Sequence, residues 1–229
     1  MKSAFLLSFT LIAFSTLAFK SVAIAAGNAN SDSLKAQGIS NSGSGTQMHA
    51  GRDGLSGLDG AKSIFPEVGQ SLPILDIQSG GELSVSNSTI VRKPWSSKTF
   101  ETAGKVQLVQ YVAANLGVGR QNKPFNDTLA KKQFSSEMLS TTVILNMVDT
   151  ASFARGMVAK KIAKKKVKHQ TINFVIDDDG MGLQHWGMKH YSYAIIILDA
   201  NGKVLFAKDG PLTEDEVEST ILLIESQLS

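Results

Sequence analysis

The hydrophobic positions of the chain fall into continuous runs and periodic runs. The stretch GKVQLVQYVAA, residues 104–114, is almost continuously apolar and rich in β-branched side chains, as is typical of a strand buried on both faces. TTVILNMV, residues 141–148, has the same character. A helix is predicted between them from about Pro124 to Phe134, because proline is accepted in a first turn. A strand, a helix and a strand in this order predict a right-handed parallel crossover.

A second helix is predicted over DTASFARGMVAKKIAKKKVK, residues 149–168. Its spacing predicts one apolar side, made of Phe153, Met157, Val158 and Ile162. The other side collects Lys160, Lys161, Lys164, Lys165 and Lys168. Such a lysine run could dock on an anionic membrane surface or an acidic partner, but a solvated helix face is the commoner explanation. We therefore expect a solvated face.

The last third of the chain predicts a strand, a short helix, a hairpin and a closing helix. The strand INFVID ends in DDDG, and a short helical segment follows around residues 183–188. AIIILD and KVLFA flank an Asn201-Gly202 turn, which is a strong hairpin signal. Thr213 and Glu216 form a capping box, and Leu212 and Val217 are placed for a hydrophobic staple. The closing helix would bury Val217, Ile221, Ile224 and Leu228.

The N-terminal part divides into three segments. Residues 1–25 combine an early lysine, an apolar run and an Ala-Ile-Ala pattern at 23–25, which predicts a cleaved signal peptide and export to the periplasm. Lys20 leaves open an uncleaved anchor, although the apolar run is short for a span, so no membrane span is expected in the mature chain. Residues 26–62 are rich in Gly, Ser and Asn and predict a flexible tether. From residue 63 short apolar runs alternate with turn signals, which predicts an N-terminal hairpin.

Composition narrows the possible functions. The chain has 229 residues, 42% hydrophobic and 19% charged, enough for one packed domain with extensions. Without residues 1–25 it would keep 21 basic and 20 acidic residues, a formal charge of +1 in place of +3, which gives no argument for nucleic acid. The chain has no cysteine, so disulfides, thiolate metal sites and thiol chemistry are excluded.

The predicted order of elements is that of a thioredoxin-like α/β domain over residues 63–229, a central mixed β-sheet flanked by helices with an N-terminal hairpin. GKVQLVQYVA, TTVILNMVD, LDANGKVLFAKDGPLTEDEV and the Lys93-Pro94-Trp95 stretch resemble the YtfJ family of exported bacterial proteins. The resemblance runs from about Phe65 to Leu228. It implies a thioredoxin-like fold and a periplasmic location, and it brings no established activity.

The loop after the first buried strand is the position of the reactive thiolate in an active thioredoxin-like enzyme. Here that loop has no cysteine, and the segment where a cis-proline is expected reads His-Tyr-Ser-Tyr, residues 190–193. Dithiol exchange and cysteine-based peroxide reduction are therefore excluded. The loop could still bind an anion through backbone N–H groups around Gly117 and Gly119 and through the Arg120 side chain. The ligand-binding candidates are Asn115, Gly117, Gly119, Arg120 and Asn122, although a tight turn is the commoner role of such glycines.

A metal site is the second possibility. Asp177, Asp179, His185 and His190 are weak candidates, since the five-residue spacing of the histidines does not place them on one helix face. A turn with surface histidines is the commoner reading. No catalytic residue is assigned and no cofactor is expected.

Two functions follow from these patterns. The first is an exported binding or interaction module for an unidentified protein or a small anionic ligand. The alternative is a metal-assisted or other non-thiol enzyme that uses the region from Asp177 to His190.

Overall fold

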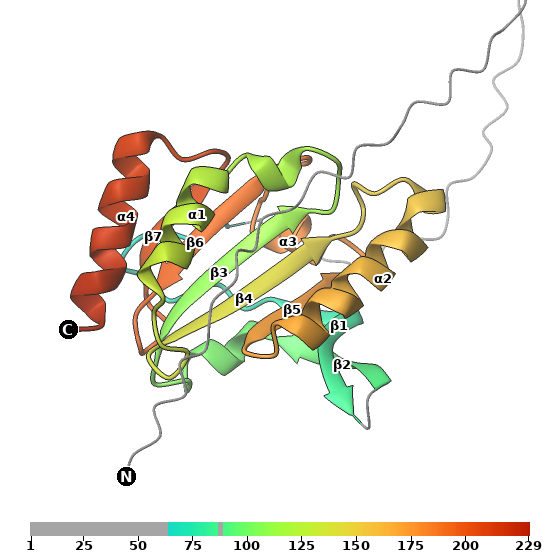
Figure 1. Ribbon diagram of the computed structural model, residues 1–229, viewed down its shortest axis with the longest axis horizontal. Helices are drawn as coiled ribbons and strands as arrows, with labels where there is room; N and C mark the ends of the chain where they lie inside the picture. Colours follow the sequence, from blue (N-terminus) through green and yellow to red (C-terminus); the bar gives the residue numbers. More distant parts are fainter. Residues whose placement is uncertain (1–63, 87–88) are drawn as a thin grey trace, which may run out of the picture. The chain divides into compact units, whose positions relative to one another are not determined.

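A seven-stranded mixed sheet forms the centre of the domain (Figure 1). The computed structural model describes residues 64–86 and 89–229, so the leader predicted over 1–25 and the tether predicted over 26–62 lie outside the described residues. The strand order is β2-β1-β5-β4-β3-β6-β7, with β3, β4 and β5 parallel and the other pairs antiparallel. The strands are β1 Asp76–Ser86, β2 Thr89–Ser96, β3 Val106–Ala113, β4 Leu139–Asn146, β5 Ile172–Asp177, β6 Tyr193–Leu198 and β7 Val204–Asp209.

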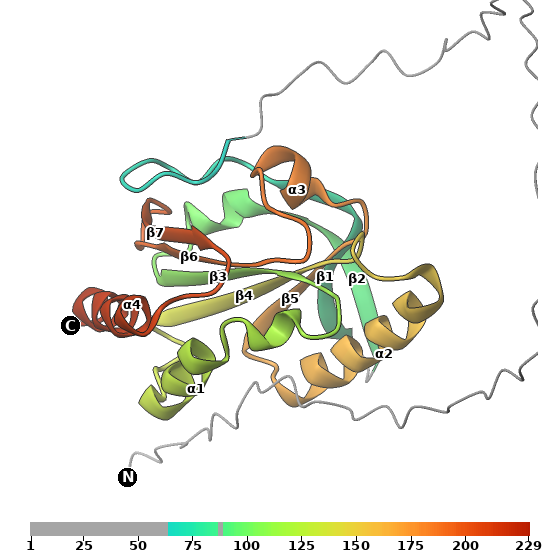
Figure 2. The same cartoon turned by 90° about the horizontal axis from the view of Figure 1, so that it is seen from above.

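Helices cover both faces of the sheet (Figure 2). They are η1 Ser97–Phe100, η2 Val118–Arg120, α1 Lys123–Lys132, α2 Ser152–Lys168, α3 Met181–His185 and α4 Glu214–Gln227. The long helices α1, α2 and α4 pack on one face, where Phe125, Ile162 and Ile221 are buried in one core. A second core on the opposite face contains Phe100 of η1 and Trp186 beside α3. Among the described residues, no helix is both long enough and apolar enough to cross a membrane.

The predicted central strand and crossover are confirmed. All eight residues of β3 are buried, because alternate side chains enter the two cores on either side of the sheet. β3 pairs in parallel with β4, and α1 lies between them in the chain. The element boundaries differ slightly from those predicted: β4 ends at Asn146, α1 ends at Lys132 and α3 begins at Met181. Gln133 adopts a left-handed conformation, which ends α1 before Phe134.

The N-terminal hairpin is confirmed as the antiparallel pair β1 and β2, but its glycines have another role. Gly80 and Gly81 do not form the turn of this hairpin, because β1 continues through them with an irregular register. Gly80 has φ +92°, and a Cβ atom there would lie 2.3 Å from the carbonyl oxygen of Ile176. Glycine thus allows β1 to approach β5 closely at a bulge.

The apolar side predicted for α2 was partly wrong. Ile162 is buried and Val158 packs against the core, but Phe153 is 90% exposed and Met157 is 48% exposed. Nine residues separate Phe153 from Ile162, which is about 2.5 helical turns and places the two on opposite sides. One lysine is buried instead: Lys166 donates to the carbonyl oxygens of Gln170 (3.0 Å) and Ile172 (2.9 Å), and burial lowers its pKa.

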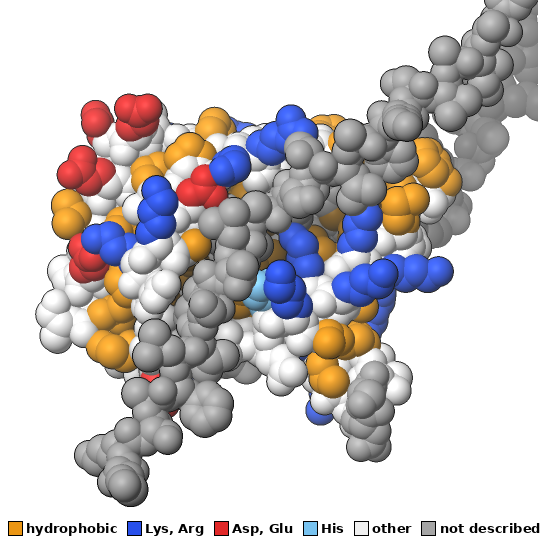
Figure 3. Space-filling view, viewed as in Figure 1, with side chains coloured by type: hydrophobic (Ala, Val, Ile, Leu, Met, Phe, Trp, Pro, Cys, Tyr) orange, Lys and Arg blue, Asp and Glu red, His pale blue; other side chains and the backbone are white. Residues whose placement is uncertain are grey.

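The closing helix α4 has the predicted N-terminus. The hydroxyl of Thr213 accepts from the Glu216 N–H at 3.2 Å, and the Glu216 carboxylate accepts from the Thr213 N–H at 2.7 Å. Lys208 of β7 also pairs with this carboxylate. Val217, Ile221 and Ile224 are buried, as predicted. Leu228 follows the end of α4 and is only partly buried against the core. Figure 3 shows acidic side chains gathered over α4 and basic side chains without acidic neighbours over α2.

We expect Gly182→Ala to destabilise the domain. A Cβ atom at residue 182 would lie 2.2 Å from the buried ring of Tyr111, and such overpacking costs about 1–3 kcal/mol. Chemical denaturation would measure the loss. Gly156→Ala in α2 is the matched control, because nothing lies within 4 Å of its Cβ position, and it should be neutral or stabilising by up to about 1 kcal/mol. Equal effects of the two substitutions would contradict the packing seen here.

We expect Glu216→Gln to reduce stability in a pH-dependent way. The hydrogen bond from Lys208 lowers the pKa of Glu216, so its contribution is present above the ordinary value of 4.5 and is lost as the pH falls through the lower folded value. The difference in unfolding free energy between the wild type and Glu216→Gln should therefore shrink on acidification. Glu218→Gln, an exposed change on the same helix, is the control. A difference that is constant with pH would contradict the prediction.

Candidate functional site

Three segments meet at one edge of the sheet. β3 and β4 are parallel, so the loops that leave them emerge side by side, and β6 begins at the same edge because it runs antiparallel to β3. The loop after β3 contains the predicted anion-binding residues. The segment before β6 contains His190 and Tyr191. This is the edge at which the predicted thioredoxin-like fold would carry its reactive thiolate.

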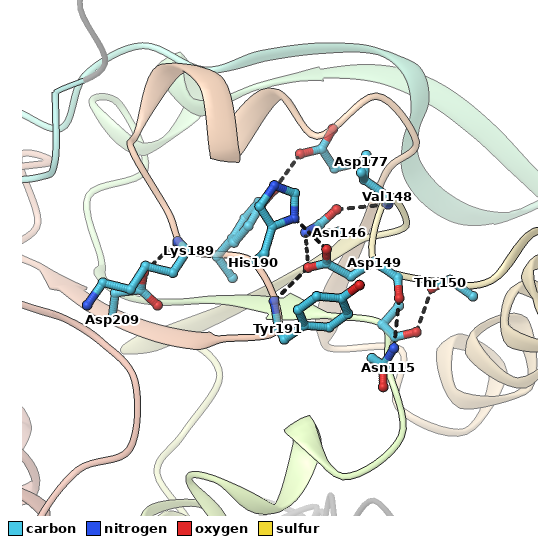
Figure 4. A network of polar contacts seen from close by, with 12 residues as sticks. Asn115, Asn146, Val148, Asp149, Thr150, Asp177, Lys189, His190, Tyr191 and Asp209 are labelled. Atoms are coloured by element: carbon cyan, nitrogen blue, oxygen red, sulfur yellow. Dashed lines mark hydrogen bonds and ion pairs between the residues drawn. The ribbon is translucent and has the colours of Figure 1, made fainter. Parts of the chain in front are cut away.

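The buried carboxylate of Asp149 holds these segments together (Figure 4). It accepts hydrogen bonds from Nδ1 of His190 at 2.6 Å, from Nδ2 of Asn146 at 2.8 Å and from the N–H of Tyr191 at 2.9 Å. Its backbone carbonyl accepts from Nδ2 of Asn115 at 2.8 Å. A buried carboxylate requires such donors, so Asp149 fixes the loops after β3 and β4 relative to the segment before β6.

The imidazole of His190 is oriented by this contact. A carboxylate only accepts hydrogen bonds, so Nδ1 carries a hydrogen and donates to Asp149. Nε2 is then the nitrogen left for a ligand, as an acceptor on the neutral ring and a donor on the charged ring. The His190 side chain is 60% exposed, whereas that of Asp149 is 2% exposed. An accessible imidazole held by a buried carboxylate can bind a ligand or transfer a proton.

Tyr191 is fixed from two sides. Its N–H points to Asp149, and its carbonyl oxygen accepts from Nε2 of Gln121 at 3.0 Å. The residue has φ +53°, in the left-handed region that a tyrosine rarely adopts. Such a conformation costs on the order of 1–3 kcal/mol and persists only where neighbouring contacts impose it. The exposed phenol side chain is therefore presented from a constrained backbone.

The loop after β3 folds into the short helix η2. Gly117 has φ +90° at the start of this turn, and the Arg120 N–H donates back to the Gly117 carbonyl oxygen at 3.0 Å. The Arg120 N–H is thus used inside the turn. It is not available to join the backbone N–H groups around Gly117 and Gly119 that were predicted to bind an anion. The Arg120 side chain is exposed and forms no ion pair within the described residues. Gly119 is half-buried, and Asn115 is exposed beside Asp149.

Asn122 does not belong to the ligand-binding set. It is buried, and its Nδ2 donates to the carbonyl oxygens of Tyr193 (3.0 Å) and Gly210 (3.2 Å). Its Oδ1 accepts from the Leu212 N–H at 2.8 Å. Because these contacts occupy the side chain, Asn122 joins α1 to the ends of β6 and β7 and has no free atom to offer a ligand.

The four weak metal candidates are not gathered into one group in the described residues. Asp177 is fully buried, and its carboxylate accepts from the Tyr111 hydroxyl (2.9 Å) and from the N–H groups of Met181 (2.8 Å) and Gly182 (3.0 Å). Burial, and then the charge of Asp177, raise the pKa of Tyr111. Residues 64–86 and 89–229 contain no group of three His, Asp or Glu side chains that could hold a metal ion. These candidates are close in the sequence, but the fold does not bring three of them together.

Asp149 is the site residue that sequence reasoning missed. The available signal was its position just after a buried strand, in NMVDT. Its link to His190 spans 41 residues, and no local pattern marks such a contact.

Proteins from two bacteria are similar to most of the described chain. An uncharacterized protein of Haemophilus influenzae is 34% identical over 156 residues, which are 68% of this chain and 83% of that protein. The uncharacterized protein YtfJ of Escherichia coli is 28% identical over 162 residues, which are 71% of this chain and 87% of that protein.

One solved structure and one family model are also similar to this chain. The crystal structure of a thioredoxin-like superfamily protein matches with a TM-score of 0.50 and 13% identity, covering 69% of this chain and 96% of the other, which supports the fold alone. The cysteine-free chain is thus thioredoxin-like, as predicted. Residues 67–227 match the family model described as "Bacterial protein of unknown function (YtfJ_HI0045)", and the chain belongs to this YtfJ family.

Proposed function

We propose that this protein is an exported binding module that uses the edge described above to hold a protein partner or a small anionic ligand. We name this region the carboxyl-edge surface and define it by the exposed side chains of Leu116, Arg120, His190 and Tyr191. With no cysteine, the protein has no thiol chemistry to contribute at this position. Export to the periplasm is supported by the leader pattern in residues 1–25.

The observation that carries the proposal is that the buried Asp149 anchors the exposed side chain of His190 and the backbone of Tyr191. Three donors fix its carboxylate, and two of them belong to His190 and Tyr191. Side chains held in place before binding lose less conformational entropy when a ligand arrives. A constrained backbone that presents a 59% exposed tyrosine side chain is consistent with this role.

The composition of the carboxyl-edge surface suits recognition. Leu116 is 79% exposed and Tyr191 is also exposed, so the surface offers apolar and aromatic contact area. Arg120 offers a planar set of donors that matches a carboxylate or phosphate. Tyrosine and arginine are enriched among residues that dominate binding energy at interfaces.

We expect Arg120→Ala to weaken binding of small anions at this surface. Titration of ¹⁵N-labelled protein with inorganic phosphate should shift the amide resonances of residues 116–121 and 190–191. Loss of a charged hydrogen-bond donor should weaken the affinity roughly tenfold or more. Arg92→Ala is the control, because Arg92 pairs with Asp178 on another part of the sheet. Shifts confined to other regions, or unchanged affinity in Arg120→Ala, would argue against anion binding here.

Native mass spectrometry of protein purified from the periplasm would test the wider proposal. Purification without added metal or chelator would preserve a bound molecule, and the mass would also report cleavage after Ala25. A stoichiometric adduct that is lost in His190→Ala and Arg120→Ala would support ligand binding at the carboxyl-edge surface. Bare protein would exclude a tightly held small ligand and direct the search to a protein partner. A chain that stays in the cytoplasm would contradict export.

A second candidate function rests on His190 and Asp149. A 60% exposed imidazole whose Nδ1 is held by a buried carboxylate would suit a general base that takes a proton from water through Nε2. This candidate corresponds to the alternative hypothesis of a non-thiol enzyme, in a form that needs no metal ion. Hydrolysis of soluble carboxylic and phosphoric esters would be the reaction to test.

The second candidate predicts that His190→Ala and Asp149→Asn both lose ester hydrolysis, since the first removes the base and the second removes the carboxylate that orients it. A loss of roughly a hundredfold is typical of a general base. His185→Ala is the control for a histidine outside the pair. Absence of turnover, or turnover that survives His190→Ala, would exclude this function and leave the binding module.

A further inference from the structure

The outer face of α2 carries a stripe of exposed residues that differ sharply from an ordinary solvated face. The stripe consists of Phe153, Met157, Lys160, Lys164, Val167 and Lys168. Apart from the adjacent Val167 and Lys168, these positions recur every three or four residues, so they lie along one side of the helix. Val158 and Ile162 occupy the opposite side, toward the core. The helix therefore carries large apolar side chains on both sides, and only the side with Val158 and Ile162 packs against the core.

The charge of α2 is wholly basic. Its sequence SFARGMVAKKIAKKKVK contains Arg155 and six lysines and no acidic residue. Lys160, Lys164 and Lys168 form no ion pair within the described residues. Figure 3 shows basic side chains over this helix without acidic neighbours, whereas the basic side chains on the other half of the face lie near acidic ones. The protein thus presents a local positive surface although its overall charge is small.

Structural needs explain only part of this pattern. Lysines in the last turn stabilise the negative end of the helix dipole, which accounts for Lys165, Lys166 and Lys168. That effect fades within one turn and does not account for Lys160 or Lys164. It also gives no reason for Phe153, which is 90% exposed one turn from Met157 on the same stripe.

We propose that the outer face of α2 docks on a membrane surface that contains anionic lipid. Lys160, Lys164 and Lys168 would contact the headgroups, while Phe153 and Met157 would enter the interface. A helix that combines lysines with exposed large apolar residues, and no acids, matches the chemistry of that boundary. Nucleic acid or an acidic protein surface would complement the lysines. The phosphate backbone of a nucleic acid, however, provides no apolar contact for Phe153 and Met157.

The outer face of α2 shares no residue with the carboxyl-edge surface, and the proposed membrane contact does not depend on the function proposed there. It would hold the domain against a bilayer without a membrane-spanning segment. The long lysine stems could lie along the interface with their ammonium groups toward the lipid phosphates.

Vesicle binding of the purified protein would test the proposal. The vesicles would contain either equal parts of phosphatidylglycerol and phosphatidylcholine or phosphatidylcholine alone, and cosedimentation would measure the affinity. We expect binding to the anionic vesicles only. Replacement of Lys160, Lys164 and Lys168 together by Gln should weaken it roughly a hundredfold, since each lysine near an anionic surface contributes severalfold to the affinity. Replacement of Lys93, Lys98 and Lys203, which are exposed on β2, on η1 and after β6, is the control with the same change of charge.

A fluorescence measurement tests the apolar part. In Phe153→Trp the new indole is at an exposed position, whereas Trp95 and Trp186 are buried, so an emission blue shift on adding anionic vesicles would report entry into the interface. Circular dichroism would verify that each variant is folded. Equal weakening by the two triple replacements, binding to neutral vesicles, or no binding at all would overturn the proposal. So would tight binding of a short DNA duplex that Phe153→Ser does not affect, because the face would then recognise polyanions in general.

Discussion

A carboxylate removed from water must be surrounded by hydrogen-bond donors, and this requirement shapes the edge of the sheet where β3, β4 and β5 end. Two buried carboxylates lie there, Asp149 just after β4 and Asp177 at the end of β5. Each accepts hydrogen bonds from three donors, some nearby and some distant: Asp149 reaches residues 190 and 191, and Asp177 reaches Tyr111. The loops at this edge are consequently held in one arrangement, although they join elements that are distant in the sequence.

The two carboxylates differ in the groups that donate hydrogen bonds to them. The donors of Asp177 are a buried tyrosine and the amides at the start of α3, so its contacts remain inside the scaffold. Asp149 instead reaches the exposed ring of His190 and the constrained backbone of Tyr191. This difference makes the Asp149 side of the edge the better candidate for binding. The same reasoning separates Asn122, whose polar atoms are all occupied, from Arg120, whose side chain extends into solvent.

The thioredoxin-like architecture places functional groups at this edge whether or not cysteine is present. A parallel β3-α1-β4 unit brings the loop after β3 beside the loop after β4, and the antiparallel β6 adds the segment that precedes it. In this chain, histidine, tyrosine, arginine and a buried aspartate occupy those loops. The scaffold is therefore compatible with binding or proton transfer, whereas thiol exchange is excluded because the chain has no cysteine.

Local features could be read from the sequence because their causes lie within a few residues. The apolar run of β3, the Asn201-Gly202 hairpin and the capping box of α4 each depend on neighbouring side chains or on a single turn, and each is confirmed. The absence of cysteine likewise excluded thiol chemistry without any coordinates. Only the tertiary structure decided that Phe153 faces outward and that Asp149 meets His190. The first depends on which side of α2 the sheet covers, and the second joins residues 41 positions apart, so both are set by packing between elements that no local pattern encodes.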